Sequence, residues 1–224
     1  MNSNRKSYSW QRVNCSYEKG LYMRIERVES LDKRKCKVFT DEDFAFLLYN
    51  GELEKYGVCE GAVLEERTER ELLDLLSRRA HERALNLLKV QDRTEGEMCR
   101  RLFQDGYPDS IVQETIGFLQ EYHFVDDARY AANYLQVHGK RKSQAELKLY
   151  LQRKGISREI IREQLEETEH DSGEAIRVLL EKKHYRAGET APEEKKKIIA
   201  YLMRRGFSWE DIRKEMKEQE DALS

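Results

Sequence analysis

A glycine recurs three times from the middle of the chain onward, each time in the same apolar setting, and this recurrence limits the possible folds. Gly106, Gly155 and Gly206 lie about 50 residues apart. Each stands four residues after a leucine and directly before an apolar residue, with further apolar residues six and ten positions later. The residues at these positions are Leu102, Tyr107, Val112 and Ile116, then Leu151, Ile156, Ile161 and Leu165, then Leu202, Phe207, Ile212 and Met216. The chain therefore contains an internal repeat.

The pattern around each glycine is that of a helix end followed by a helix start. Glycine readily takes the left-handed conformation that ends a helix, and the apolar residue after it folds back onto that helix. Pro108, Ser157 and Ser208 then stand where the next helix begins. Periodic apolar residues predict one more helix upstream of each pair, over residues 69–90, 126–138 and 172–184. The sequence therefore predicts a mainly α protein, with three tandem three-helix repeats stacked in an elongated, curved array.

The residues before these repeats follow a different period. Between Leu21 and Tyr49, apolar and polar residues alternate, so that Met23, Ile25 and Val28 tend to one side, and charged turns interrupt the alternation. This pattern predicts a small N-terminal antiparallel β-meander, followed by a short helix and a glycine turn. The predicted organisation is a flexible N-terminus, a β-rich extension and three helical repeats, at residues 1–18, 19–64, 65–124, 125–169 and 170–224.

Charge is abundant but nearly balanced, with 41 Lys and Arg residues against 43 Asp and Glu residues and a formal net charge of −2. A protein that binds mainly by neutralising phosphates is usually clearly basic. The composition therefore does not favour naked nucleic acid as the sole partner, although local basic clusters can still make contacts.

The cysteines and histidines form no metal-binding or catalytic pattern. Cys15, Cys36, Cys59 and Cys99 include no CxxC pair, and no HExxH, phosphate loop or nucleophile elbow occurs. We therefore expect neither a metal nor another cofactor. The first residues lack the apolar core of a signal peptide, and no apolar run is long enough to span a bilayer. These features predict a cytoplasmic protein with no membrane partner, which we expect to be a monomer.

The segment FVDDARYAANYL contains two adjacent aspartates that admit two interpretations. Asp126 lies where the first helix of the second repeat begins, so it is the expected N-cap, and Asp127 falls in the first turn, where the helix dipole favours an anion. Tyr130 and Ala131 then face inward, and the alanine allows another helix to approach closely. The alternative, a catalytic carboxylate pair, lacks a histidine, a lysine or a third acid at supporting spacing. The sequence therefore favours a structural role.

Four aromatic residues near this segment could either stack on bases or lie in the core. Tyr122, Phe124, Tyr130 and Tyr134 are interpreted as members of one inward-facing stripe. We therefore expect them in the hydrophobic core rather than in a base-stacking platform.

A set of cations in the second repeat is the best candidate for a contact surface. Few acids interrupt it, and three of its members are adjacent in a loop where a neutral turn would suffice. The candidates are Lys140, Arg141, Lys142, Lys148, Arg153, Lys154, Arg158 and Arg162. For any one of them, a solvated face or a helix C-terminus that favours positive charge is the better explanation. As a set, they predict a surface for an anionic partner.

Together these segments resemble the RecX family, bacterial regulators of the RecA recombinase. The first is an alanine–leucine helix followed by a Thr-x-x-Glu helix start, in RAHERALNLLKVQDRTEGEMCRRLFQDGY. The second contains Asp126, Asp127, Tyr130 and Ala131, in FLQEYHFVDDARYAANYL. The third places basic residues before the helix end at Gly155, in GKRKSQAELKLYLQRKGI. The resemblance covers residues 65–216, and the strand-rich start resembles an extension found on many Gram-positive members.

The resemblance implies a non-enzymatic modulator of RecA. Proteins of this family bind RecA filaments on single-stranded DNA, lie in the filament groove and lower ATP hydrolysis and strand exchange. The resemblance places the implied contacts in the middle repeat, at Lys140, Arg141, Lys142, Lys148, Arg153 and Lys154. The first repeat departs from the pattern, because Asp105 precedes its glycine where a basic residue is usual. The third repeat has a long loop, HYRAGETAP. A uniform contact scheme in every repeat therefore does not follow.

Three functions compete at this point. A modulator of RecA filaments rests on the three repeats and the resemblance. A stand-alone nucleic-acid binder would use the basic set, against which the near-zero net charge argues. An enzyme would rest on the acidic pair alone.

Overall fold

The computed structural model describes residues 23–41, 45–168 and 171–221. It divides into two compact parts, residues 1–72 and 73–224, and each part is described by itself. The predicted flexible N-terminus, residues 1–18, lies outside the described residues.

The N-terminal part contains the predicted β-meander. Its strands are β1 (Ile25–Ser30), β2 (Lys35–Thr40) and β3 (Ala45–Tyr49), paired antiparallel in the order β1-β2-β3. A bulge between Ile25 and Arg27 shifts the alternation by one residue, so that Val28 is more buried than Arg27. The short helix α1 (Asn50–Tyr56) follows and ends at Gly57, whose φ is 63°. Ile25, Val38 and Phe46 form the buried centre of the sheet. The predicted meander, short helix and glycine turn are therefore confirmed.

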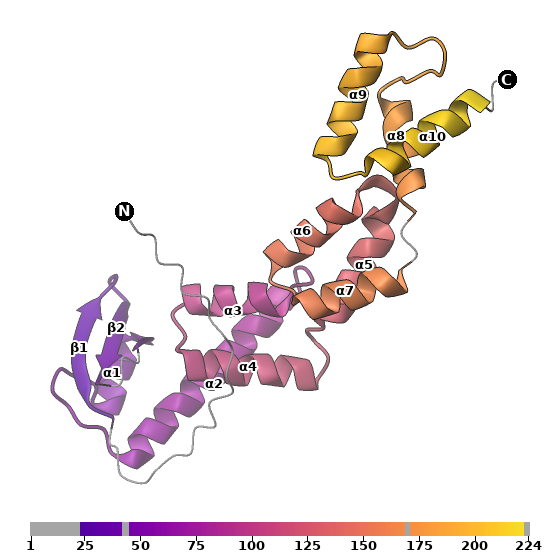
Figure 1. Cartoon of the computed structure of the whole chain (residues 1–224). Helices are drawn as coiled ribbons and strands as arrows, with labels where there is room; N and C mark the ends of the chain where they lie inside the picture. The colour runs from indigo at the N-terminus through magenta and orange to yellow at the C-terminus, as the bar shows by residue number, and fades with distance from the viewer. Residues whose placement is uncertain (1–22, 42–44, 169–170, 222–224) are drawn as a thin grey trace. The chain divides into compact units, whose positions relative to one another are not determined.

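In the part of the chain that the structure describes, nine helices form the three predicted three-helix repeats (Figure 1). Repeat 1 consists of α2 (Glu66–Leu88), α3 (Glu95–Gln104) and α4 (Asp109–Glu121). Repeat 2 consists of α5 (Asp127–His138), α6 (Gln144–Lys154) and α7 (Arg158–Glu167), with the short 3-10 helix η1 (Gly139–Arg141) between α5 and α6. Repeat 3 consists of α8 (Ser172–Lys182), α9 (Pro192–Arg204) and α10 (Trp209–Asp221). The division between the two compact parts falls inside α2.

The middle helix of each repeat ends at the recurring glycine, as the sequence predicts. Gly106, Gly155 and Gly206 have φ values of 85°, 96° and 87°. The residue after each glycine donates its N–H to the carbonyl of the leucine four residues before the glycine, with N···O distances of 3.1, 3.2 and 3.3 Å. These bonds satisfy carbonyls that the helix itself leaves free. The apolar residue is thereby drawn back onto the helix it follows.

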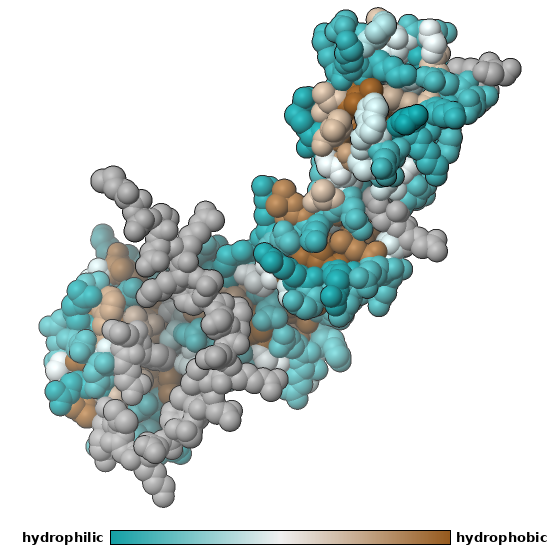
Figure 2. All heavy atoms as spheres, viewed as in Figure 1, coloured by the Kyte–Doolittle hydropathy of each residue, from teal (hydrophilic) through white to brown (hydrophobic). Residues whose placement is uncertain are grey.

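Each repeat has a separate hydrophobic core. Leu102, Leu151 and Leu202 are fully buried, one in each core. The residues six positions after the glycines, Val112, Ile161 and Ile212, are fully buried as well. The spacing around the glycines therefore identified the core of every repeat. Figure 2 shows that most of the visible surface is hydrophilic, with hydrophobic residues in separate small groups.

Two further helices end in the same turn without a glycine. His123 after α4 and His184 after α8 both have a φ of 55°. Phe124 N donates to Leu119 O at 2.8 Å, and Tyr185 N donates to Leu180 O at 3.0 Å. A left-handed conformation is uncommon for residues other than glycine, although histidine tolerates it better than most. No residue pattern in the sequence predicts these two turns.

The turn at His123 makes one prediction about the aromatic residues wrong. Tyr122 and Phe124 are 60% and 47% exposed, because the turn directs Val125, not the aromatic rings, into the core of repeat 1. The two rings lie instead in a surface cluster with Phe118. Tyr130 and Tyr134 are half-buried against the core of repeat 2, as expected.

Candidate functional site

Six of the predicted contact residues are exposed cations of repeat 2, and five of these have no close ion pair with another described residue. Arg141 lies in η1, Lys148 and Arg153 lie in α6, and Arg158 and Arg162 lie in α7. Arg162 has a distant ion pair with Glu166, at 3.8 Å. For the other four, no ion pair with another described residue is found.

The outward face of α6 is the most cationic of these surfaces. Leu149 is 48% exposed, and Arg153, one turn after it, lies on the same side of the helix, while the exposed Lys148 directly precedes it in sequence. The only acid in α6 is Glu146, which is paired with Arg205. In α7, by contrast, four glutamates accompany Arg158 and Arg162. The exposed part of α6 therefore offers an apolar residue and two cations, without competing acids.

The other three candidates already have partners within the molecule. The Lys140 amine lies 3.2 Å from the Glu174 carboxylate in α8, although the lysine side chain is 72% exposed. Lys142 donates a hydrogen bond to the Tyr134 hydroxyl and lies over the stacked rings of Tyr134 and Tyr150. Lys154 pairs with Glu97 of repeat 1 at 2.6 Å. The predicted set therefore divides into exposed cations without a close partner, the exposed but paired Lys140, and the half-buried Lys142 and Lys154.

Lys154 belongs to a junction between repeats 1 and 2. Thr94 caps α3, because its hydroxyl oxygen accepts from Glu97 N at 3.2 Å while Glu97 accepts from Thr94 N. The same hydroxyl donates to the Lys154 carbonyl, near the end of α6, at 2.6 Å. The hydrogen bond to Glu97 raises the pKa of the Lys154 amine above its ordinary value. One capping box thus both begins α3 and holds the end of α6.

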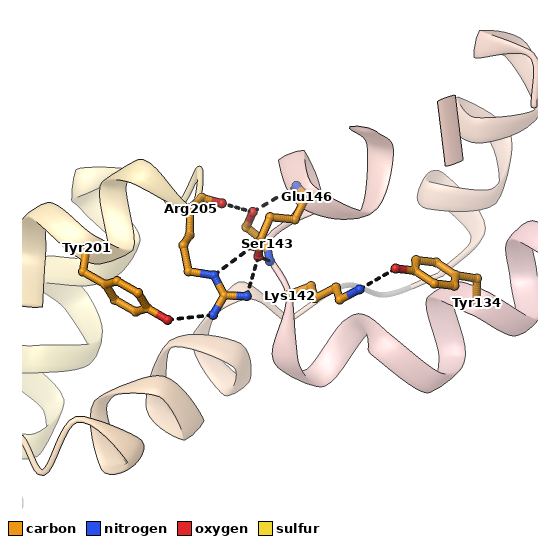
Figure 3. A network of polar contacts seen from close by, with 6 residues as sticks. All are labelled: Tyr134, Lys142, Ser143, Glu146, Tyr201 and Arg205. Atoms are coloured by element: carbon orange, nitrogen blue, oxygen red, sulfur yellow. Dashed lines mark hydrogen bonds and ion pairs between the residues drawn. The ribbon is translucent and has the colours of Figure 1, made fainter. Parts of the chain in front are cut away.

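An equivalent junction joins repeats 2 and 3 (Figure 3). Ser143 caps α6 with the same kind of box, and its hydroxyl donates to the Arg205 carbonyl at the end of α9. The Arg205 guanidinium donates to both carboxylate oxygens of Glu146, at 2.8 and 3.0 Å, and to the Tyr201 hydroxyl at 3.0 Å. This fork geometry is the one that arginine, unlike lysine, provides.

The chain approaches itself closely at both junctions, backbone against backbone at the first and backbone against the Ala145 side chain at the second. A Cβ added at Gly96 would lie 3.0 Å from the Gly155 Cα, and a Cβ added at Gly206 would lie 2.6 Å from the Ala145 Cβ. The negative end of one helix therefore meets the positive end of another, α6 against α3 and α9 against α6, which favours the contact electrostatically. Close contact thus favours glycine at Gly96, Gly155 and Gly206, and the positive φ favours it again at the last two.

The paired aspartates act at two helix N-termini. Asp126 is the N-cap of α5, and its carboxylate accepts from Arg129 N at 2.9 Å, at the position expected from the sequence. Asp127 lies in the first turn, but its carboxylate accepts from Glu95 N at 2.9 Å and so caps α3 of the preceding repeat. Burial, and then the charge of Asp126, raises the pKa of Asp127 despite the hydrogen bond from Glu95. The second role is a contact between repeats that sequence reasoning missed.

Asp127→Asn and Asp127→Ala are expected to differ at neutral pH. Asparagine keeps an oxygen for the Glu95 N–H, so we expect stability equal to or above wild type, whereas alanine loses about 1 kcal/mol with the cap. Because the folded-state pKa of Asp127 is raised, its charge costs stability above that pKa. That cost disappears as the pH falls toward the unfolded value of about 4, so the advantage of asparagine should shrink there. Denaturant unfolding at several pH values measures both effects. An asparagine variant as unstable as the alanine variant at neutral pH would contradict the capping role.

The residues that make the junctions were visible in the sequence but were not paired. Thr94 and Glu97 were recognised as a helix start, and Gly155 as a helix end. The sequence signal for such a junction is a capping box in one repeat and a cation directly before the glycine of the next repeat. Sequence reasoning did not identify Ser143 and Glu146, the second box.

The described ranges contain neither a candidate metal site nor a candidate membrane-spanning helix. Within them, no group of three or more His, Cys, Asp or Glu side chains could hold a metal ion. No helix there is long and apolar enough to cross a membrane.

Comparisons with known proteins agree with this architecture. Family models for the first, second and third three-helix domains of RecX match residues 80–119, 126–165 and 171–216. The chain is 28% identical over 203 residues to the regulatory protein RecX of Clostridium acetobutylicum, covering 87% of this chain and 95% of that protein. It is 33% identical over 135 residues to the regulatory protein RecX of Clostridium tetani, covering 58% and 62%.

Solved structures show the same fold. A crystal structure of regulatory protein RecX matches with a TM-score of 0.59 at 22% identity, covering 87% of this chain and 99% of that one. The structure of RecX from Lactobacillus salivarius matches with a TM-score of 0.56 at 21% identity, covering 66% and 97%. The three matched ranges fall one in each of the three repeats and together span more than half of the chain, so this protein belongs to the RecX family of regulatory proteins.

Proposed function

We propose that this chain is a non-enzymatic regulator that binds RecA filaments on single-stranded DNA and lowers their ATP hydrolysis and strand exchange. Membership of the RecX family, through all three helical repeats, is the observation that carries the proposal. Tandem repeats also suit an extended partner, because they present a long surface instead of a closed pocket.

The contact surface that we propose is centred on α6. Lys148, Leu149 and Arg153 are exposed there, and Arg141 and Arg158 lie in the adjoining segments. Cations of this kind fit a partner that carries phosphates and acidic side chains. The exposed leucine fits a protein surface better than bare DNA, since phosphates offer it no apolar contact.

The ATPase of the cognate RecA on single-stranded DNA tests the proposal. We expect substoichiometric amounts of this protein to lower the rate. Lys148→Glu combined with Arg153→Glu should weaken the effect by roughly tenfold or more, because two attractive charges become repulsive. An unchanged ATPase and unchanged strand exchange with the wild-type protein would contradict the proposal.

A matched control separates a local surface from net charge. Lys214 and Lys217 are exposed on α10. Their double replacement by glutamate changes the net charge equally and should leave inhibition nearly intact. Binding to single-stranded DNA without RecA, measured against salt, addresses the alternative of a stand-alone nucleic-acid binder. Tight binding that falls steeply with salt and is lost in the α6 variant would favour that alternative.

A further inference from the structure

The residue directly before the recurring glycine differs in charge among the three repeats. It is Lys154 in repeat 2 and Arg205 in repeat 3, but Asp105 in repeat 1. Asp105 pairs within its own repeat, with Arg83 at 2.7 Å and Arg101 at 3.3 Å. A contact surface common to all repeats does not account for this change of sign.

The junctions account for it. Lys154 meets Glu97 of the preceding repeat, and Arg205 meets Glu146 of the preceding repeat. Within the described residues, no repeat precedes α3 to supply such a glutamate to its end. A cation therefore occurs before the glycine where a preceding repeat supplies an acidic capping box, and an acid occurs where none does.

The burial of these pairs agrees with a role inside the protein. The side chains of Lys154 and Glu97 are 25% and 16% exposed, and those of Arg205 and Glu146 are 24% and 30% exposed. Lys148 and Arg153, by contrast, are exposed and have no ion pair with another described residue. The cations of α6 thus fall into two kinds, although they are nearly adjacent in sequence.

We infer that Lys154 and Arg205 are positioning residues, which fix consecutive repeats against one another through Glu97 and Glu146, and are not contact residues for the partner. Each pair adds to a hydroxyl-to-carbonyl bond and a close backbone contact at the same helix ends. The pairs thereby set where the exposed cations of one repeat lie relative to those of the next. The consequence for filament binding rests on the proposed function, whereas the role in the junction does not.

A double-mutant cycle on filament binding distinguishes positioning from contact. Lys154→Met removes a positive charge and Glu97→Gln removes a negative charge, so a contact role predicts opposite effects on an anionic partner. A positioning role predicts that both weaken binding, by roughly threefold to tenfold, and that the double variant is no weaker than either single one. The Lys154→Arg variant should bind filaments with an affinity within about twofold of wild type, because it keeps the positive charge at this position.

Lys148 provides the matched comparison in the same helix. Lys148→Met should weaken binding additively with Glu97→Gln, because the two side chains share no contact. It should also reduce the salt dependence of the dissociation constant, whereas Lys154→Met should leave that dependence nearly unchanged. Unfolding curves recorded on every variant establish that each is folded at the assay temperature. Stronger binding by Glu97→Gln, or additivity between Glu97 and Lys154, would overturn the inference.

Amide hydrogen exchange tests the junction without RecA. Lys154→Met and Glu97→Gln should each speed exchange at the start of α3 and the end of α6, and Lys148→Met should not. Should the wild-type protein fail to bind filaments, the proposed function fails, and this measurement still decides the junction. Exchange rates unchanged from wild type would overturn the junction itself.

Discussion

Gly155→Val is expected to destabilise the protein by roughly 4 kcal/mol, and Gly155→Ala by roughly 2 kcal/mol. Two costs combine at this position. The φ of 96° is unfavourable for any side chain and worst for a β-branched one, and a Cβ would lie 3.1 Å from the Gly96 Cα. Backbone on both sides of the contact leaves little room for relief. Thermal or denaturant unfolding measures the two losses.

Gly188 provides a control with strain but no crowding. Its φ is 76°, and no atom lies within 4 Å of an added Cβ. Gly188→Ala should therefore cost only about 1 kcal/mol. The difference between the two alanine variants reports the close contact between α3 and α6. Equal losses at Gly155 and Gly188 would show that the close contact adds nothing to the cost at Gly155.

Glu215→Ala is expected to cost about 2 kcal/mol, a large loss for a charged residue of an amphipathic helix. Glu215 in α10 is only 4% exposed, and its carboxylate accepts from Arg177 of α8 at 2.7 Å. A Cβ added at Gly173 would lie 2.1 Å from this carboxylate, so the carboxylate packs directly against the first turn of α8. Because Arg177 is about half exposed, its remaining charge can be hydrated, which keeps the loss below that of a fully buried pair.

Two comparisons isolate the cause of this loss. Glu215→Gln keeps the shape and removes the charge, so its loss should fall between those of wild type and the alanine variant. Lys214→Ala, at the neighbouring exposed position, should change stability by less than about 0.5 kcal/mol. Denaturant unfolding of the three variants is the measurement. A Glu215→Ala variant as stable as Lys214→Ala would contradict the importance of this buried carboxylate.

The sequence predicts the parts of this fold that depend on local conformation. The three recurring glycines predict the ends of α3, α6 and α9, because a left-handed turn depends on only a few adjacent residues. The turns at His123 and His184 have the same geometry but escaped prediction, since histidine carries no comparable preference. The elongated, curved arrangement of the repeats and the boundaries drawn between them stay predictions.

Contacts between distant residues were predictable only in part. The cations of repeat 2 were found by composition, but nothing local separates Lys154, which pairs with Glu97, from Arg153, its exposed neighbour. The difference arises from helix phase and from the approach of another repeat. Asp127 illustrates the same limit, because its first-turn position was evident and its partner in repeat 1 was not.

The chemistry of the helix ends also bears on self-association. A head-to-tail contact between copies generates open-ended fibres when the rotation does not close. To extend the array by the geometry of the two junctions, the end of α3 in one molecule would have to meet the start of α9 in another. The first carries the carboxylate of Asp105, and the second begins at Ala191, which has no hydroxyl to donate, and continues with acidic residues. These two ends therefore supply neither the hydroxyl donor nor the pair of cation and acid that joins the repeats within one chain, which disfavours polymerisation by that contact.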